Sequence, residues 1–173
     1  AAEIHKSVVS LDSIGAIVDS APLPEPCDPK APEVPTFRFD DVQFGYVADQ
    51  PVFSGLSLTA AEGEITALIG PSGSGKSTVT RLAARFWDVG QGSITIGGVD
   101  VRDIPTAKLM EMTSMVFQDV YLFDATIAEN VRISRPKATD AEVTNALHRA
   151  GLDQTIARLP EGINSQVGEG GQK

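Results

Sequence analysis

The stretch Gly70-Pro71-Ser72-Gly73-Ser74-Gly75-Lys76-Ser77 decides the fold, because it has the pattern G-x-x-x-x-G-K-[ST]. Its glycines permit a tight, partly left-handed backbone that points successive amide groups at an anion. A helix predicted over 76–86 adds the positive end of its dipole. Lys76 offers a charged donor to β- and γ-phosphates, and the Ser77 hydroxyl can bind Mg²⁺. The stretch therefore predicts a phosphate-binding loop rather than a flexible Gly/Ser turn.

The segments around this loop predict an α/β fold. Alternating apolar residues predict strands, and apolar residues three and four apart predict helices. The predicted strands are 36–39, 42–46, 56–59, 64–69, 93–96, 99–101 and 114–117, and the predicted helices after the loop helix are 106–112, 126–132, 140–150 and 153–158. Asp140 is expected to cap the helix over 140–150, and Gly151 to end it.

Two segments precede this globular region of residues 36–173. Apolar residues three and four apart predict a helix over 1–20, which opens without a capping residue and so suggests a cut inside a longer helix. Residues 21–35 hold six of the chain's 11 prolines. Proline lacks an amide donor and has a fixed φ, so this segment is expected to be an extended, semi-rigid linker.

Composition excludes several classes of function. The chain has 173 residues, 14 Lys+Arg against 23 Asp+Glu, and a net charge of −9, which disfavours a nucleic-acid partner. Its one cysteine, Cys27, excludes an internal disulfide framework and a multi-cysteine zinc site. His5 and His148 lie far apart in sequence and do not have the spacing of metal ligands. No apolar run is long enough to predict a membrane-spanning helix.

Further segments occur in a characteristic order. They are Phe44-Gly45-Tyr46, Met115-Val116-Phe117-Gln118-Asp119, the run over 122–131, and Val167-Gly168-Glu169-Gly170-Gly171. In this order they closely resemble the nucleotide-binding domain of an ABC transporter, of the exporter type in which permease and ATP-binding domain share one polypeptide. The resemblance implies a P-loop NTPase core with an N-terminal antiparallel β subdomain, the start of a helical subdomain, and an N-terminal helix stub.

The resemblance also implies roles for the matching residues. Tyr46 matches the aromatic residue that stacks on adenine, and Gly70 to Thr78 match the loop that holds the phosphates of ATP. Gln118 matches a glutamine that contributes to the Mg²⁺ site and orients the attacking water. The implied cofactors are therefore ATP and Mg²⁺, with Ser77 and Gln118 at the metal, and with Lys76 and Gln118 in catalysis.

The resemblance further implies partners and a location. Residues 1–20 would end the last transmembrane helix, residues 21–35 would be its connector, and the whole would lie at the cytoplasmic face of the cell membrane. The segment after Gln118, with Val120, Tyr121, Leu122 and Phe123, would contact the permease domain. The loop over 165–171 would face the permease or its partner. A second nucleotide-binding domain would complete a head-to-tail dimer.

Three parts of the family pattern do not occur in these 173 residues. They are the L-S-G-G-Q signature, an apolar strand ending in Asp-Glu, and a later switch histidine. We therefore expect a sequence truncated at both ends that binds Mg-ATP weakly and does not hydrolyse it appreciably. Residues 36–173 would be a partial ATP-binding domain. The transported substrate (siderophore, lipid, peptide or drug) stays open, as does the choice between homodimer and heterodimer.

Two alternatives belong to other classes of protein. A soluble P-loop enzyme such as a small-molecule kinase would leave the segment over 122–130 unexplained. A nonhydrolytic regulatory module that binds ATP would need no signature and no Asp-Glu pair.

Overall fold

The computed structural model describes residue 18, residues 21–168 and residue 170. The chain divides into two units, Ala1–Ser114 and Met115–Lys173, which we describe separately. The helix predicted over 1–20 lies outside the described residues, except for Val18. Among the described residues, none of the helices has the length and apolar character needed to cross a bilayer.

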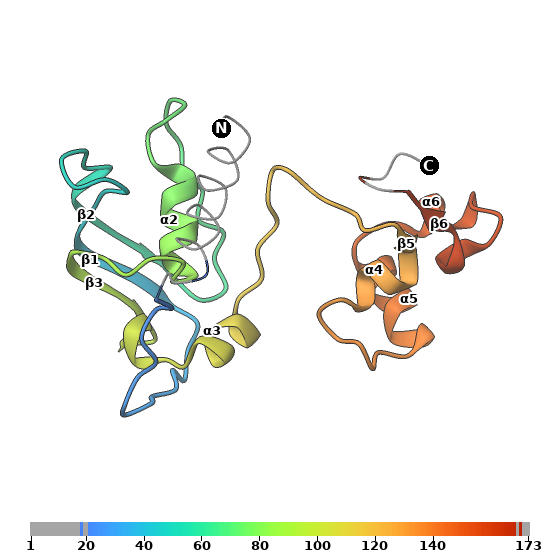
Figure 1. Ribbon diagram of the computed structural model, residues 1–173, viewed down its shortest axis with the longest axis horizontal. Coiled ribbons are helices and arrows are strands. Elements are labelled where there is room, and N and C mark those ends of the chain that lie inside the picture. The colour runs from blue at the N-terminus through green and yellow to red at the C-terminus, as the bar shows by residue number, and fades with distance from the viewer. Residues whose placement is uncertain (1–17, 19–20, 169, 171–173) are drawn as a thin grey trace, which may run out of the picture. The chain divides into compact units, whose positions relative to one another are not determined.

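The first unit is built on an antiparallel sheet with the strand order β2-β1-β3-β4 (Figure 1). Its strands are β1 (Phe37–Phe44), β2 (Phe53–Ala60), β3 (Gln91–Ile96) and β4 (Val99–Asp100). The strands predicted over 56–59, 93–96 and 99–101 are thereby confirmed. The two strands predicted over 36–39 and 42–46 are one strand, with a register shift between Phe39 and Val42.

The register shift in β1 is a bulge at Asp41. Asp41 has a φ of 46°, a left-handed conformation that residues with a side chain rarely adopt. Its amide donates a hydrogen bond to Ser57 Oγ at 3.0 Å, which holds the bulge in place. A Cβ atom on Gly92 would lie 2.4 Å from the Asp41 carbonyl oxygen, so only glycine fits on the neighbouring strand. The bulge explains why the apolar alternation breaks at this point in the sequence.

Helix α2 (Lys76–Ala83) packs on this sheet. Val79 and Leu82 of α2 share one buried apolar cluster with Phe39 and Ile94 of the strands. The cluster also contains Val42, Phe44, Ile96, Val101, Ile104 and Leu109. The last three come from the short helix η1 (Val101–Asp103), from the residue after it, and from α3 (Thr106–Met112), which confirms the helix predicted over 106–112. The core thus fixes the helix that follows the phosphate loop.

Two predicted strands are wrong. Residues 64–69 and 114–117 have no regular secondary structure, and Ile65 and Val116 are 101% and 92% exposed. A buried strand of a parallel sheet needs a neighbouring strand to pair with its backbone. Within the described ranges, every strand is paired antiparallel with another strand, and none lies beside these two apolar runs. Their apolar side chains therefore remain exposed to solvent.

The second unit consists of short helices and one small antiparallel pair of strands. Its elements are β5 (Ala125–Thr126), α4 (Ile127–Arg132), α5 (Asp140–Arg149), α6 (Asp153–Ala157), the short helix η2 (Gly162–Asn164) and β6 (Gln166–Val167). Ala128, Val143 and Leu147 form its buried centre. The helices predicted over 126–132, 140–150 and 153–158 are confirmed, and Gly151 ends α5 with a φ of 73°.

Thr139, and not Asp140 as predicted, caps α5. The Thr139 side chain accepts from the Glu142 amide, and the Glu142 carboxylate accepts in return from the Thr139 amide. Thr126 and Glu129 form the same reciprocal box at the start of α4. The spacing S/T-x-x-E marks such a box in a sequence, so the correct cap was visible there. These hydrogen bonds hold the pKa of Glu129 and of Glu142 below the usual range.

The second unit is therefore expected to lose stability in acid. Because folding lowers both carboxyl pKa values, their contribution is present above the ordinary value of 4.5 and is lost as pH falls through the folded values. Hydrogen exchange of the α4 and α5 amides is measured at pH 5 and pH 3 and corrected for intrinsic rates. From pH 5 to pH 3 it should accelerate more in the unchanged chain than in the double variant Glu129→Gln/Glu142→Gln. Glutamine still accepts from the cap but does not titrate. Equal acceleration in both proteins would contradict this prediction.

Candidate functional site

The predicted phosphate loop leads directly into α2. Gly73 and Gly75 have φ values of 81° and 87°, in the left-handed region that the sequence predicted for the loop. A Cβ atom on Gly75 would lie 2.6 Å from a ring carbon of Phe53, so a side chain is excluded there. Gly75 caps α2 without a side-chain hydrogen bond, and the first turn has no acidic residue. The first amides of α2 therefore remain available to an anion.

Lys76 folds back over this loop. Its Nζ atom donates to the carbonyl oxygens of Gly70 and Pro71 at 2.9 and 2.7 Å, and lies 3.4 Å from Ser74 Oγ. These three contacts hold a positive charge beside the open amides of α2. Ser77 follows in the first turn of the helix with an exposed side chain. The Lys76 ammonium, the uncapped amides of α2 and the exposed Ser77 hydroxyl together suit the binding of a phosphate chain with its metal ion.

Tyr46 lies next to the same helix. Its hydroxyl donates to Thr78 Oγ1 at 3.1 Å, and Thr78 is buried in α2, next after Ser77. Its ring packs edge to face on Phe44 and on Trp87, with ring centroids 5.0 Å apart in both pairs. Tyr46 as a whole residue is 44% exposed. A partly exposed aromatic ring is thus fixed beside the phosphate loop.

Sequence reasoning missed the part that Trp87 plays here. Trp87 contacts the rings of Tyr46 and Phe86, with ring centroids 5.0 and 6.4 Å away. Nothing in the spacing of Tyr46 and Trp87 could reveal this contact. The contact arises because the end of β1 and the end of α2 meet at one edge of the core.

Gln118 belongs to the second unit, whereas Tyr46 and residues 70–78 belong to the first. Gln118 is exposed and lies in a segment without regular secondary structure. The first unit therefore unites the loop, Lys76, Ser77, Thr78 and Tyr46 in one site, and Gln118 belongs to the second unit. Among the described residues, no group of three His, Cys, Asp or Glu side chains is arranged to hold a metal ion.

The segment after Gln118 and the loop near residue 167 lie together in the second unit. Strands β5 and β6 pair Ala125 with Val167, and the Gly170 amide donates to the Leu122 carbonyl oxygen at 3.0 Å. The Asn130 side chain accepts from the Phe123 amide at 2.9 Å and donates to the Phe123 carbonyl oxygen at 3.1 Å. These bonds hold in place a segment whose apolar side chains are largely exposed.

An apolar pocket of about 460 Å³ lies beside this segment. Tyr121, Leu122 and Val167 line one part of it, and α4, α5 and α6 supply most of the rest. Val120 and Phe123 are 70% and 54% exposed nearby in the chain. A soluble domain rarely exposes so many large apolar side chains without a partner, so this surface suits a docked apolar element.

Comparison with known proteins places the chain among transporters. The profile of the family described as "ABC transporter" matches residues 53–173. The chain is 47% identical over 134 residues to "Iron-sulfur clusters transporter atm1, mitochondrial" of Aspergillus fumigatus, covering 78% of the chain and 18% of that protein. It is 36% identical over 173 residues to "Fatty acid ABC transporter ATP-binding/permease protein" of Mycobacterium tuberculosis, covering 97% of the chain and 27% of that protein.

A solved structure has the same fold. It is "Structure of a bacterial Atm1-family ABC exporter with ATP bound", with a TM-score of 0.84 and 36% identity, covering 97% of this chain and 30% of that chain. This likeness confirms the expected α/β, P-loop NTPase fold class. The chain spans less than a third of the length of each of these relatives.

Proposed function

The chain belongs to the ABC transporter family, and on that premise we propose that it is the ATP-binding part of a transporter that couples ATP binding and hydrolysis to transmembrane transport. Residues 36–173 are part of the ATP-binding domain, residues 21–35 are a connector, and residues 1–20 end the last transmembrane helix. The observation that carries the proposal is the joint placement of Tyr46, Lys76 and the open amides of α2 around one loop.

Different residues of the site bind different parts of ATP. The amides of Gly70 to Ser77 and the Lys76 ammonium hold the phosphates, because both carry positive charge toward an anion. The ring of Tyr46 stacks on adenine, and its bond to Thr78 fixes the distance from base to phosphates. Bound Mg²⁺ neutralises negative charge on the phosphate oxygens, and the Ser77 hydroxyl and the Gln118 amide oxygen would hold it.

Net charge does not assist this binding. Residues 36–173 carry 12 Lys+Arg against 17 Asp+Glu, so the region that binds an anion is itself acidic. Affinity must come from the local geometry of the loop. The contacts of Lys76 to the carbonyl oxygens of Gly70 and Pro71 support this, since they hold the ammonium over the loop before any phosphate arrives.

Coupling to transport requires two partners. A second ATP-binding domain, facing the first head to tail, would supply the signature that clamps the nucleotide, and binding would close the pair. The exposed segment over 120–123 would pass this closure to the permease domain, and the pocket beside it would receive part of that domain. The name of the fatty acid transporter, which combines ATP-binding protein and permease, supports a permease in the same polypeptide.

The relatives are membrane transporters, and we propose the cytoplasmic face of the cell membrane as the location. The names of relatives include a mitochondrial transporter of iron-sulfur clusters, a transporter of fatty acids and an importer of mycobactin. Their ATP-binding parts are similar whereas their named substrates differ in chemistry. The substrate would accordingly be selected by the permease domain and not by residues 36–173.

Calorimetric titration with Mg-ATP tests the proposal. The unchanged chain should bind it saturably without releasing phosphate, and Tyr46→Ala should weaken binding by about 1–3 kcal/mol, roughly 5- to 150-fold in Kd, because a base–aromatic stack is lost. Trp87 is the only tryptophan, and its ring contacts Tyr46, so its emission should change with ATP.

Tyr46→Phe is the matched control for this titration. It keeps the ring and removes only the hydroxyl bonded to Thr78, so most of the affinity should remain. Equal Kd values for the alanine variant and the unchanged chain would contradict the assigned role of Tyr46. A chain that shows no saturable binding of Mg-ATP would contradict the proposed function itself.

A further inference from the structure

The proline-rich segment over 21–35 is hydrogen-bonded to the rest of the first unit and is not only an extended spacer. Residues 21–35 have no regular secondary structure, as their prolines predicted. Yet residues 24–30 are bonded to Arg85 just after α2, to Asp103 of η1 and to Thr106 of α3. We call residues 24–30 the strap. Its contacts are a structural feature that proline content alone does not predict.

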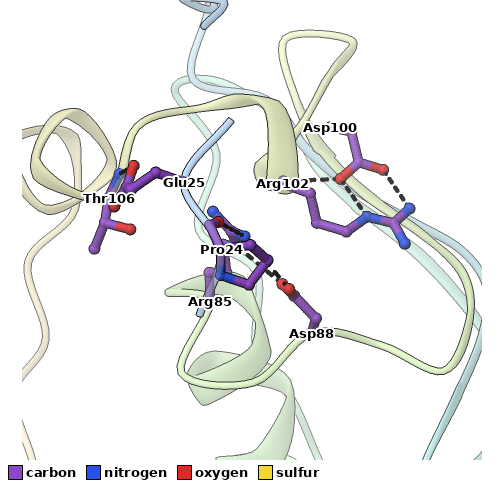
Figure 2. Close-up of polar contacts among 7 residues, drawn as sticks. All are labelled: Pro24, Glu25, Arg85, Asp88, Asp100, Arg102 and Thr106. Atoms are coloured by element: carbon purple, nitrogen blue, oxygen red, sulfur yellow. Dashed lines mark hydrogen bonds and ion pairs between the residues drawn. The ribbon is translucent and has the colours of Figure 1, made fainter. Parts of the chain in front are cut away.

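Arg85 anchors the first end of the strap (Figure 2). Its Nη2 atom donates to the Pro24 carbonyl oxygen at 2.8 Å, and its Nε atom donates to Asp88 Oδ1 at 2.9 Å. Arg85 is only 4% exposed, and its backbone has a φ of 53°. A buried guanidinium group without acceptors is costly, so the strap carbonyl is part of what keeps this charge in the core.

Glu25 and Lys30 fasten the strap to the segment after the sheet. Glu25 Oε2 accepts from the Thr106 amide at 3.1 Å, at the start of α3 (Figure 2), and hydrogen bonding from the Thr106 side chain and amide lowers the pKa of Glu25. The Lys30 amide donates to the Asp103 carbonyl oxygen at 2.8 Å, and its Nζ atom pairs with Asp103 Oδ2 at 2.8 Å. The neighbouring Arg102 pairs with Asp100, which leaves Asp103 to Lys30.

The anchor of the strap is the end of the helix that begins at the phosphate loop. Arg85 comes directly after Ala84, the C-cap of α2, and its amide donates to the Leu82 carbonyl oxygen at 3.0 Å. Lys76 begins the same helix, about 12 Å away along an axis of eight residues. Leu82 is fully buried between these two ends. The helix therefore begins at the nucleotide-binding lysine, and the strap is bonded to the chain just beyond its other end.

We propose that Arg85 is a positioning residue that fastens the strap to the end of α2, so that residues 24–30 move as one body with the phosphate loop. The inference rests on the proposed function, which places a transmembrane helix before the strap. It adds a connection between nucleotide and permease that does not pass through the segment after Gln118. Because energetic coupling is reciprocal, loosening the strap also weakens nucleotide binding.

A spin label on Cys27 measures the mobility of the strap directly. Cys27 is the chain's only cysteine, it is exposed, and it lies between the two ends of the strap. A nitroxide label on Cys27 of the 173-residue chain should give a restrained spectrum. The label should become mobile in Arg85→Ala and in the double variant Glu25→Ala/Lys30→Ala. The side chains of Glu25 and Lys30 are exposed and do not support the core. Arg81→Ala is the matched control for Arg85→Ala, because Arg81 is an exposed residue of α2 and its loss changes the net charge equally, whereas the Glu25→Ala/Lys30→Ala pair leaves the net charge unchanged.

Mg-ATP titration of the same variants supplies the second reading. Both strap variants should raise the Kd about five-fold or more, the lower end of typical coupling, and Arg81→Ala should not. Because Arg85 is buried, the thermal midpoint of each variant is recorded. If Arg85→Ala unfolds, the double variant Glu25→Ala/Lys30→Ala alone tests whether loosening the strap raises the Kd.

The outcomes separate the inference from the proposed function. If the label spectrum is the same in all variants, or if the label becomes mobile while the Kd for Mg-ATP stays unchanged, the inference about the strap is overturned. The proposal that the chain binds ATP is not affected by either outcome. An unchanged chain that does not bind Mg-ATP overturns the proposed function, and the coupling of strap to nucleotide with it. A freed label together with a raised Kd in both strap variants supports the inference.

Discussion

Lys76→Ala is expected to reduce Mg-ATP binding by about two orders of magnitude or more. A hydrogen bond to a charged group contributes about 1.5–3 kcal/mol, and Lys76 is placed to make such bonds to two phosphates. The variant also removes the positive charge held over the loop by Gly70 and Pro71. Calorimetry or equilibrium dialysis with labelled ATP measures the change.

Lys108→Ala is the matched control for this variant. Lys108 lies in α3 of the same unit, is half exposed and pairs only across one helical turn with Glu111. It makes the same change in net charge without touching the loop, so the Kd should stay as in the unchanged chain. If both variants lose affinity alike, the effect of Lys76 is one of overall charge, and its assignment to the phosphates is wrong.

Leu82→Ala is expected to destabilise the first unit by about 2–5 kcal/mol, the range for deleting a buried leucine side chain. Leu82 is 0% exposed and joins α2 to the strands of the sheet. Small domains are stable by only about 5–15 kcal/mol, so this loss is a large fraction of the total. Urea unfolding followed by Trp87 emission, which reports on the first unit, measures it.

Leu82→Met keeps the volume of the side chain and serves as the control. Exchange of similar apolar volumes usually costs less than about 1.5 kcal/mol. The alanine variant should also weaken Mg-ATP binding when part of the chain is unfolded, and saturating ATP should raise its urea midpoint. A loss below about 1 kcal/mol would mean that α2 is not held by this core.

The parts of the site that lie close together in sequence were predictable. The loop, the first turn of α2 and the left-handed glycines follow from local backbone geometry, which the residues between Gly70 and Ser77 dictate by themselves. The capping boxes at Thr126 and Thr139 are equally local, but neither was predicted, and at α5 Asp140 was preferred to the threonine before it. Such features need no partner from elsewhere in the chain.

The two wrong strand predictions concern segments whose structure depends on distant partners. The apolar runs over 64–69 and 114–117 have the composition of buried strands, but pairing requires another strand alongside. The contact of Trp87 with Tyr46 and the bond of Arg85 to Pro24 join residues 41 and 61 positions apart. No periodicity in a sequence encodes contacts of this kind.

The sequence by itself therefore determined the phosphate loop, the helix that follows it, the antiparallel strands and the family resemblance. These rest on local conformation and on motifs whose residues are near neighbours. Only the tertiary structure placed Tyr46 against Thr78 and Trp87, and turned a proline-rich linker into a strap bound by Arg85. The physical reason is that a motif acts through its own backbone, whereas a long-range contact exists only once the core has brought its two segments together.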